Sequence, residues 1–202
     1  MKTLLLIAAL AAAPETVEPS AAYFFDVAGK TVPVELDKAF DPKALAAEKS
    51  VTLRVGPNRK FAYGGIEFLY PRQYTWEADV EPRLATWTLS GNDCKVMVHR
   101  YAGITDVGQV VDAIGASMLK QFKIEGQKPA EVKLELQGHK LTGKRVEIVV
   151  ATHRIFTDIY GLKVGGGVVL LVLQDSPTEA GGPSAERIEM GKLLAQSFKA
   201  AK

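Results

Sequence analysis

The segment 131–175 constrains the fold most, because it predicts consecutive antiparallel strands joined by short turns. Apolar and polar residues alternate from Val132 to Gln137, the pattern of a strand with one buried face and one exposed face. Further strands are expected over 145–152, 155–164 and 168–173. Their short connections favour antiparallel neighbours, since a parallel return needs a crossover of about a dozen residues or more.

The strand expected over 168–173 differs from the others because every one of its residues is apolar. Such a run is typical of a strand with both faces covered, so it is predicted to lie at the centre of the sheet with other layers above and below. A turn at Gly165, Gly166 and Gly167 precedes it, and a longer turn is expected over 138–143. Helices are needed to cover the sheet.

Strand patterns also fill the first half of the chain. A hairpin is expected between 51–55 and 61–70, with its turn at Gly56, Pro57 and Asn58. A small hairpin is predicted from 23–27 and 31–36, joined around Gly29. Further strands are expected over 76–80, 84–89 and 94–101.

Two segments have helical spacing instead. Apolar residues recur every three or four positions over 106–123, with Thr105 or Asp106 as the N-cap. A final helix is expected after Ser184, and a short one from Asp41. The apolar stripe predicted for the final helix is Ile188, Gly191, Leu194, Ala195 and Phe198. The predicted fold class is therefore α+β, an antiparallel β-sheet with helices packed on it.

The first residues have the features of a secretory signal, a short basic start followed by the apolar run Leu4–Leu10. This run is too short to span a bilayer core of about 30 Å as a helix; the alternatives are a frayed terminus or a short anchor. The expected organisation is a signal peptide at 1–11, a flexible tether at 12–22, an N-terminal extension at 23–60 and the main domain at 61–202. The protein is predicted to be exported, to the periplasm or the extracellular space.

Composition excludes one class of partner. The chain has a net charge of +2, and its 25 basic residues are scattered, so nucleic acid is not an expected partner. Cys94 is the single cysteine, which leaves no internal disulfide. It is predicted to be a small buried hydrophobe, and the alternative is a reactive thiol.

The candidates for chemistry are few. His139 and His153 flank one predicted strand and so lie at its opposite ends, and His99 has no ligand partner at close spacing. No metal, no cofactor and no acid/base pair is expected, and the protein is predicted not to be an enzyme. The glycines at 165–167 precede a strand rather than a helix, which favours a turn over an anion-binding loop.

One loop concentrates the residue types that are favoured at protein interfaces. Arg72, Tyr74 and Trp76 follow the strand that ends at Pro71, and arginine and aromatic residues dominate interface hot spots. These three residues are the predicted partner-binding site. The alternative is that the aromatic side chains close the end of the core.

Several short motifs resemble those of the PsbP-like superfamily. They are Gly-Ile-Glu-Phe-Leu-Tyr-Pro at 65–71 with Tyr74 after it, Leu-Gln-Gly at 136–138, and Leu-Thr-Gly-Lys-Arg at 141–145. The superfamily includes the extrinsic protein of photosystem II, a Ran-binding import factor and bacterial DcrB-like envelope proteins. The resemblance covers about 61–199 and implies an α/β/α sandwich with a non-catalytic role in binding or assembly. The resemblance does not identify partner-binding residues in this chain.

The leading hypothesis is an exported, non-catalytic binding or assembly-accessory protein of the bacterial envelope, with another envelope or secreted protein as partner and no transmembrane segment after signal removal. A second hypothesis is a carrier, with a small apolar ligand or peptide in a cleft between the sheet and the helix at 106–123. Met118 and Phe122 would line that cleft. The third is a hydrolase or lyase whose site gathers His99, a carboxylate and a hydroxyl from distant residues.

Overall fold

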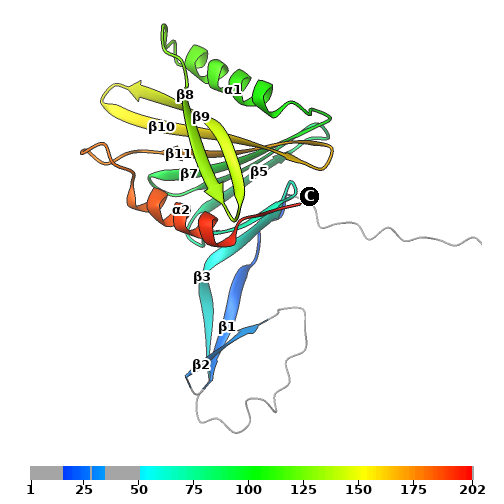
Figure 1. The fold of residues 1–202 in the computed structure, drawn as a ribbon. Coiled ribbons are helices and arrows are strands. Elements are labelled where there is room, and N and C mark those ends of the chain that lie inside the picture. The colour runs from blue at the N-terminus through cyan, green and yellow to red at the C-terminus, as the bar shows by residue number, and fades with distance from the viewer. Residues whose placement is uncertain (1–15, 28, 35–50, 202) are drawn as a thin grey trace, which may run out of the picture.

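A computed structural model describes residues 16–27, 29–34 and 51–201. The predicted signal at 1–11 and the short helix expected from Asp41 lie outside these residues. Within the described ranges the chain forms two antiparallel sheets and two α-helices (Figure 1). The predicted α+β class with an antiparallel sheet is confirmed, and the division of the strands between two sheets was not foreseen.

The larger sheet holds the core of the molecule. Its strand order is β5-β6-β7-β11-β10-β9-β8, so β11 is central, as predicted. The strands are β5 (Thr75–Val80), β6 (Leu84–Ser90), β7 (Cys94–Ala102), β8 (Ala130–Leu136), β9 (His139–Val150), β10 (His153–Val164) and β11 (Gly167–Asp175). Every residue from Val168 to Leu173 is at most 2% exposed, which confirms that both faces of this strand are covered.

The smaller sheet has the order β12-β4-β3-β1-β2. Its strands are β1 (Ala21–Val27), β2 (Lys30–Val34), β3 (Val51–Tyr63), β4 (Ile66–Pro71) and β12 (Lys199–Ala200). The small hairpin expected around Gly29 is confirmed as β1 and β2. Because β1 begins at Ala21, the last two residues of the predicted tether belong to a strand.

The hairpin turn predicted at Gly56, Pro57 and Asn58 is wrong, because β3 runs through these residues without turning. The turn lies instead at Gly64 and Gly65, whose φ angles of 63° and 82° suit a two-residue hairpin. The β1–β3 register shifts opposite 56–58, between the pairs Tyr23–Val55 and Ala21–Arg59. The proline therefore sits at a bulge, where a strand tolerates a residue without an N–H.

The six-residue turn predicted over 138–143 is also wrong. The connection is the two-residue turn Gln137–Gly138, with φ angles of 47° and 82°, and β9 begins at His139. Gly143 lies inside β9, where a Cβ would come within 2.2 Å of the backbone oxygen of Ile159. That glycine therefore serves close backbone packing rather than a turn.

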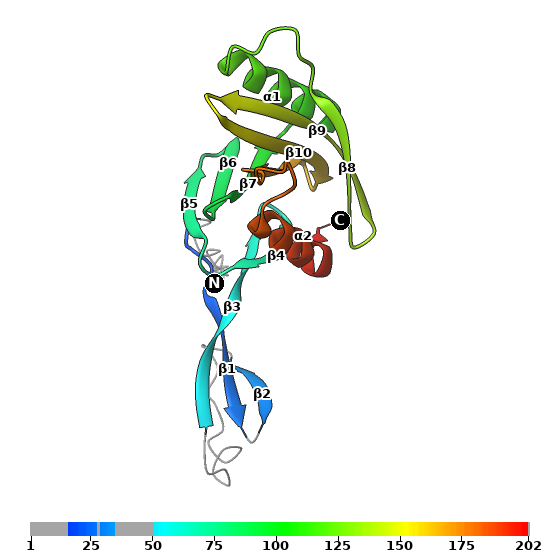
Figure 2. The ribbon, with the colours of Figure 1, turned by 90° about the vertical axis from the view of Figure 1, so that its left-hand side faces the viewer.

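The two helices cover opposite faces of the larger sheet (Figures 1 and 2). Helix α1 (Val107–Gln121) begins at the predicted N-cap Asp106, whose carboxylate accepts the backbone N–H of Gln109 at 2.9 Å. Its buried residues pack with Val168, Leu170 and Val172 of β11. The alternate residues of that strand, Val169, Leu171 and Leu173, lie in the cluster on the side of α2.

Helix α2 (Ala185–Ser197) begins after the N-cap Ser184, as predicted. Its predicted apolar stripe is wrong in part, because Ile188 is 47% exposed and Ala195 is exposed as well. The buried residues are Met190 and Leu194, followed by Phe198. They pack in the main core with residues of both sheets, so α2 joins the two sheets.

Strands β1 and β2 and the first part of β3 project from the body (Figures 1 and 2). We call β1, β2 and Val51–Val55 of β3 the arm. Because β3 continues from the arm into the body across positions 60 and 61, the extension expected at 23–60 shares a strand with the main domain. The arm strands pair within the smaller sheet. No helix in the described ranges is both long and apolar enough to cross a membrane.

Candidate functional site

The three residues predicted to bind a partner do not form one exposed surface. Tyr74 is 2% exposed and lies in the core, where burial raises the pKa of its hydroxyl. Trp76 is half-buried against Phe61 and Tyr63, and Arg72 is exposed. The aromatic side chains therefore close the end of the core, which was the alternative interpretation. A partner contact at these residues stays a prediction.

Trp76 also holds the segment that precedes the arm. Its indole N–H donates to the carbonyl of Thr16 at 3.2 Å, and the hydroxyl of Tyr63 donates to the carbonyl of Val17 at 2.7 Å. Arg59 forms an ion pair with Glu18, which raises the pKa of the arginine. These contacts secure the segment 16–20 against β3 and β5, so they determine where β1 enters the arm.

The arm has an apolar face, which follows from its strand register. Directly paired residues of antiparallel strands share a face, and Phe25 pairs with both Leu53 and Val32. The alternate rows on either side repeat the pattern. The residues of this face are Tyr23, Phe25 and Val27 of β1, Val32 and Val34 of β2, and Val51, Leu53 and Val55 of β3, with Lys30 at the outer end.

The opposite face of the arm carries a polar network beside Phe24 and Pro33. The carboxylate of Asp26 accepts hydrogen bonds from the Thr31 hydroxyl at 2.8 Å and from the Arg54 guanidinium at 2.7 Å. The hydrogen bond from Arg54 is the main reason that the pKa of Asp26 lies below its ordinary value. These three residues come from all three strands, so the network ties the arm together on its solvated side.

Much of the apolar face is open to solvent. Leu53 is 56% exposed and Val55 is 42% exposed, with Val32 at 39% and Val51 at 38%. Within the described ranges, no strand pairs with the outer edge of β2 or with the outer edge of β3 before Asn58. The arm thus presents exposed apolar side chains and unpaired strand edges together. We call the apolar face of the arm, as defined above by its residues, the arm face.

Of the groups considered for catalysis, His99 lies beside one hydroxyl, and the strand register places the carboxylate residue Asp79 in the same row of the sheet. The Nδ1 atom of His99 lies 3.0 Å from the hydroxyl of Thr86, and burial lowers the pKa of this histidine. His139 and His153 begin different strands, and no group of three potential metal ligands occurs in the part of the chain that the structure describes. Cys94 is 1% exposed, and burial raises the pKa of its thiol to about 11, so the expected buried hydrophobe is found.

The cleft expected beside α1 is small and lies at a different place on the helix. A hollow of about 400 Å³ borders the first turns of α1, with Val107, Val111 and Gly161 among its lining residues. Met118 and Phe122, the residues expected to line it, are at the other end of the helix. Met118 packs against the core, and Phe122 is 42% exposed.

Sequence reasoning missed the arm face, although half of the signal was present. From Val51 to Val55 apolar residues alternate with Thr52 and Arg54, which predicts a strand with one apolar face. The pattern of 23–27 is less clear, because Phe24 stands between Tyr23 and Phe25. Such patterns place apolar residues on one side of a strand. They do not show that the strands extend away from the body, which depends on the length of β3.

No protein-family model and no curated protein matches the sequence of the chain. Among solved structures, the chain is similar to one from Bacteroides thetaiotaomicron VPI-5482, with a TM-score of 0.46 and 10% identity over 73% of this chain; the match spans 50% of that protein. A mutant of protein Mog1 matches with a TM-score of 0.47 and 10% identity, over 72% of this chain and 96% of that one. The Saccharomyces cerevisiae Ran-binding protein Mog1p matches over the same shares, with a TM-score of 0.46 and 10% identity. The chain is thus structurally similar to Mog1 proteins, and this similarity concerns the fold alone.

Proposed function

We propose that the protein is an exported, non-catalytic binding protein that supports the assembly or action of another envelope or secreted protein, which it contacts with the arm face. The observation that carries this proposal is the exposure of Leu53 and Val55 on a projecting sheet whose opposite face holds the polar network of Asp26, Thr31 and Arg54. Exposed apolar patches with a polar surround mark sites of protein interaction.

The energetics favour a protein surface as the occupant. Burying an aliphatic side chain such as Leu53 contributes about 1.5–3 kcal/mol when it is fully withdrawn from water. Four exposed aliphatic residues in adjacent rows can therefore contribute substantially to affinity. A three-stranded apolar face suits the apolar face of another sheet or helix, since such faces pack by side-chain interdigitation.

The arm contact can be tested by site-specific photo-cross-linking in cells of the source organism. A photoreactive amino acid replaces Leu53 in one strain and Thr52 in another. These two neighbours point to opposite faces of β3, so each serves as the matched control of the other. We expect Leu53 to cross-link to one protein of the envelope or secreted fraction, and Thr52 to cross-link far less.

A charge on the arm face supplies a second readout. Once cross-linking has identified the partner, affinity purification tests its binding without a cross-linker. Leu53→Asp is expected to abolish co-purification of the partner, whereas Thr52→Asp is expected to retain it. Because Leu53 is exposed, its substitution should leave folding stability within about 1 kcal/mol of the parent. Equal cross-linking from both positions, or cross-links to a second copy of this chain alone, would contradict the proposal.

Export is tested separately, by fractionation and N-terminal sequencing of the native protein. We expect the mature chain to begin near Ala12 and to leave the cytoplasm, because 1–11 has the pattern of a signal peptide. A chain that keeps Met1 and stays in the cytoplasm would contradict export without bearing on the arm.

A further inference from the structure

A second concave surface lies between α2 and the larger sheet, and none of its lining residues belongs to the arm. It encloses about 370 Å³ between β9, β10 and β11 on one side and α2 with the loop before it on the other. Its lining combines two arginines, Arg145 and Arg187, with apolar residues that include Phe156 and Leu173. We call this hollow the arginine pocket.

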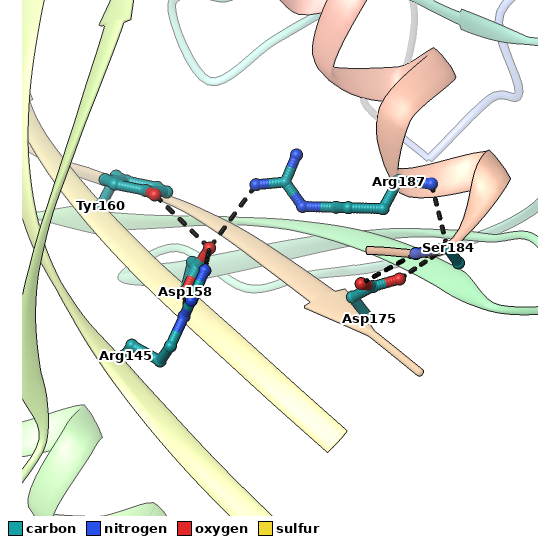
Figure 3. A network of polar contacts seen from close by, with 6 residues as sticks. All are labelled: Arg145, Asp158, Tyr160, Asp175, Ser184 and Arg187. Atoms are coloured by element: carbon teal, nitrogen blue, oxygen red, sulfur yellow. Dashed lines mark hydrogen bonds and ion pairs between the residues drawn. The ribbon is translucent and has the colours of Figure 1, made fainter. Parts of the chain in front are cut away.

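The carboxylates of the arginine pocket already have donors. Asp158, which is 2% exposed, accepts two hydrogen bonds from Arg145, one from the Tyr160 hydroxyl at 3.4 Å and one from Arg187 at 3.5 Å (Figure 3). Asp175 accepts from the hydroxyl and the backbone N–H of Ser184, at 2.6 and 3.3 Å. Both carboxylates therefore already accept hydrogen bonds from the protein itself.

The arginines, by contrast, retain donors. Arg145 uses its Nε and one Nη2 hydrogen on Asp158, and Arg187 uses one Nη2 hydrogen at 3.5 Å, the outer limit for a hydrogen bond. Among the described residues, neither side chain has a further hydrogen-bond acceptor. The side chain of Arg187 is only 17% exposed, so its guanidinium has lost much of its water without gaining a close acceptor. A desolvated charged donor in this state favours an anionic acceptor.

The apolar part of the pocket determines what else the ligand carries. The guanidinium of Arg145 lies over the ring of Phe156, 5.1 Å from its centroid, which leaves the arginine bound to the apolar wall. Leu173, Pro183 and Ile188 complete this wall. Gly191 faces the same space from α2, where a Cβ would lie 3.4 Å from an Nη1 atom of Arg187.

We propose that the arginine pocket binds a small organic carboxylate with an apolar body. The carboxylate pairs with Arg187 and Arg145, because a planar guanidinium matches a carboxylate through two parallel hydrogen bonds. The apolar body lies against Phe156 and Ile188. The volume of about 370 Å³ is at the small end of the range for ligand sites, which fits a short-chain acid rather than a long lipid.

The test is titration of the mature protein with hexanoate, followed by calorimetry and by amide NMR shifts. Hexanamide is the neutral control of the same shape, and acetate and inorganic phosphate are anions without the apolar body. We expect hexanoate to bind saturably and to shift the amides of Gly181 and Gly191, which border the pocket. Hexanamide is expected to bind at least about tenfold more weakly, since it loses the hydrogen bonds between charged groups. Acetate and phosphate are expected to bind at least about tenfold more weakly, since they bury little or no apolar surface.

Two variants address the pocket by different routes. Arg187→Gln removes the charge while Arg145 still holds Asp158, and Gly191→Leu fills the pocket without altering any charge. Each is expected to weaken hexanoate binding about tenfold. Arg83→Gln, at an exposed arginine outside the pocket lining, is the matched control and is expected to bind as the parent does.

Equal binding of hexanoate and hexanamide would overturn the proposal, and so would phosphate binding as tight as hexanoate binding. Retention of hexanoate binding in Gly191→Leu would overturn it as well, even if Arg187→Gln fails to fold. None of these outcomes bears on the arm, because the two sites share no residues.

Discussion

Arg145 and Asp158 stand directly opposite each other on β9 and β10, and two hydrogen bonds of 2.6 and 2.8 Å join the guanidinium to the buried carboxylate. The aspartate side chain is 3% exposed, whereas the arginine side chain is 42% exposed, so the pair links the interior of the sheet to its surface. With Tyr160 and Arg187 as further donors, the burial of this carboxylate is compensated.

The first prediction concerns this ion pair. Asp158→Asn removes the charge that three donor side chains share, and hydrogen bonds to a charged group contribute about 1.5–3 kcal/mol. We expect the free energy of unfolding to fall by about 2–3 kcal/mol in urea denaturation. Glu147→Gln is the control, because its ion pair with Arg154 is 37% and 53% exposed and should contribute less than about 1 kcal/mol. An equal loss of unfolding free energy in the two variants would show that the buried ion pair of Asp158 stabilises the fold no more than an exposed one.

The second prediction is a pH dependence due to Glu186. Its partial burial alone would raise the pKa, but N–H donors from Asp93, Cys94 and Asn92 outweigh burial and hold the pKa below the ordinary 4.5. The unfolded state therefore binds the proton first as the pH falls. The contribution of this carboxylate is complete above about pH 4.5 and is lost as the pH falls through the lower folded-state pKa.

Urea denaturation at a series of pH values measures this contribution. We expect Glu186→Gln to have a lower free energy of unfolding than the parent at pH 7. Between about pH 6 and about pH 3, the free energy of unfolding of this variant should fall by less than that of the parent. Glu189→Gln, at an exposed position of the same helix, should keep the slope of the parent. A parallel slope for Glu186→Gln would mean that the hydrogen bonds to the β6–β7 turn do not stabilise the folded state.

The third prediction concerns the packing of α1 on β10. A Cβ at Gly161 would come within 2.4 Å of Val107 and 2.8 Å of Val111, so the absence of a side chain lets the helix approach the strand. Gly161→Ala should destabilise the fold by about 1–3 kcal/mol, the cost of overpacking a core. Gly166→Ala is the control, since a Cβ there has no neighbour within 4 Å among the described atoms. Thermal denaturation measures the effect. An equal decrease in the melting temperature of both variants would contradict this role of Gly161.

The fourth prediction is that Cys94 is unreactive in the folded protein. Burial raises the pKa of its thiol to about 11, so the thiol stays protonated at neutral pH, and the side chain is inaccessible. A thiol-reactive dye should label the native protein at a small fraction of the rate found in urea. Labelling of the native protein at the rate of the unfolded chain would favour the alternative of a reactive thiol.

The candidate sites followed only partly from sequence. The aromatic loop was visible as a motif, but sequence patterns do not distinguish Tyr74 at an interface from Tyr74 in the core, because both favour aromatic residues. The arginine pocket had no local signal at all. Arg145 and Arg187 are far apart in sequence, and they meet only because α2 returns over the strand that pairs with β9.

Local patterns determined the elements. The caps at Asp106 and Ser184, the apolar run of β11 and its central place follow from side-chain chemistry that acts within a few residues. The tertiary structure decided that β3 continues through Gly56 and Pro57, and that its outer part carries the arm face into solvent. Whether the residues around Pro57 form a strand or a turn depends on which segments pair with them. Those segments are distant in sequence, so the pattern of residues around Pro57 does not reveal them.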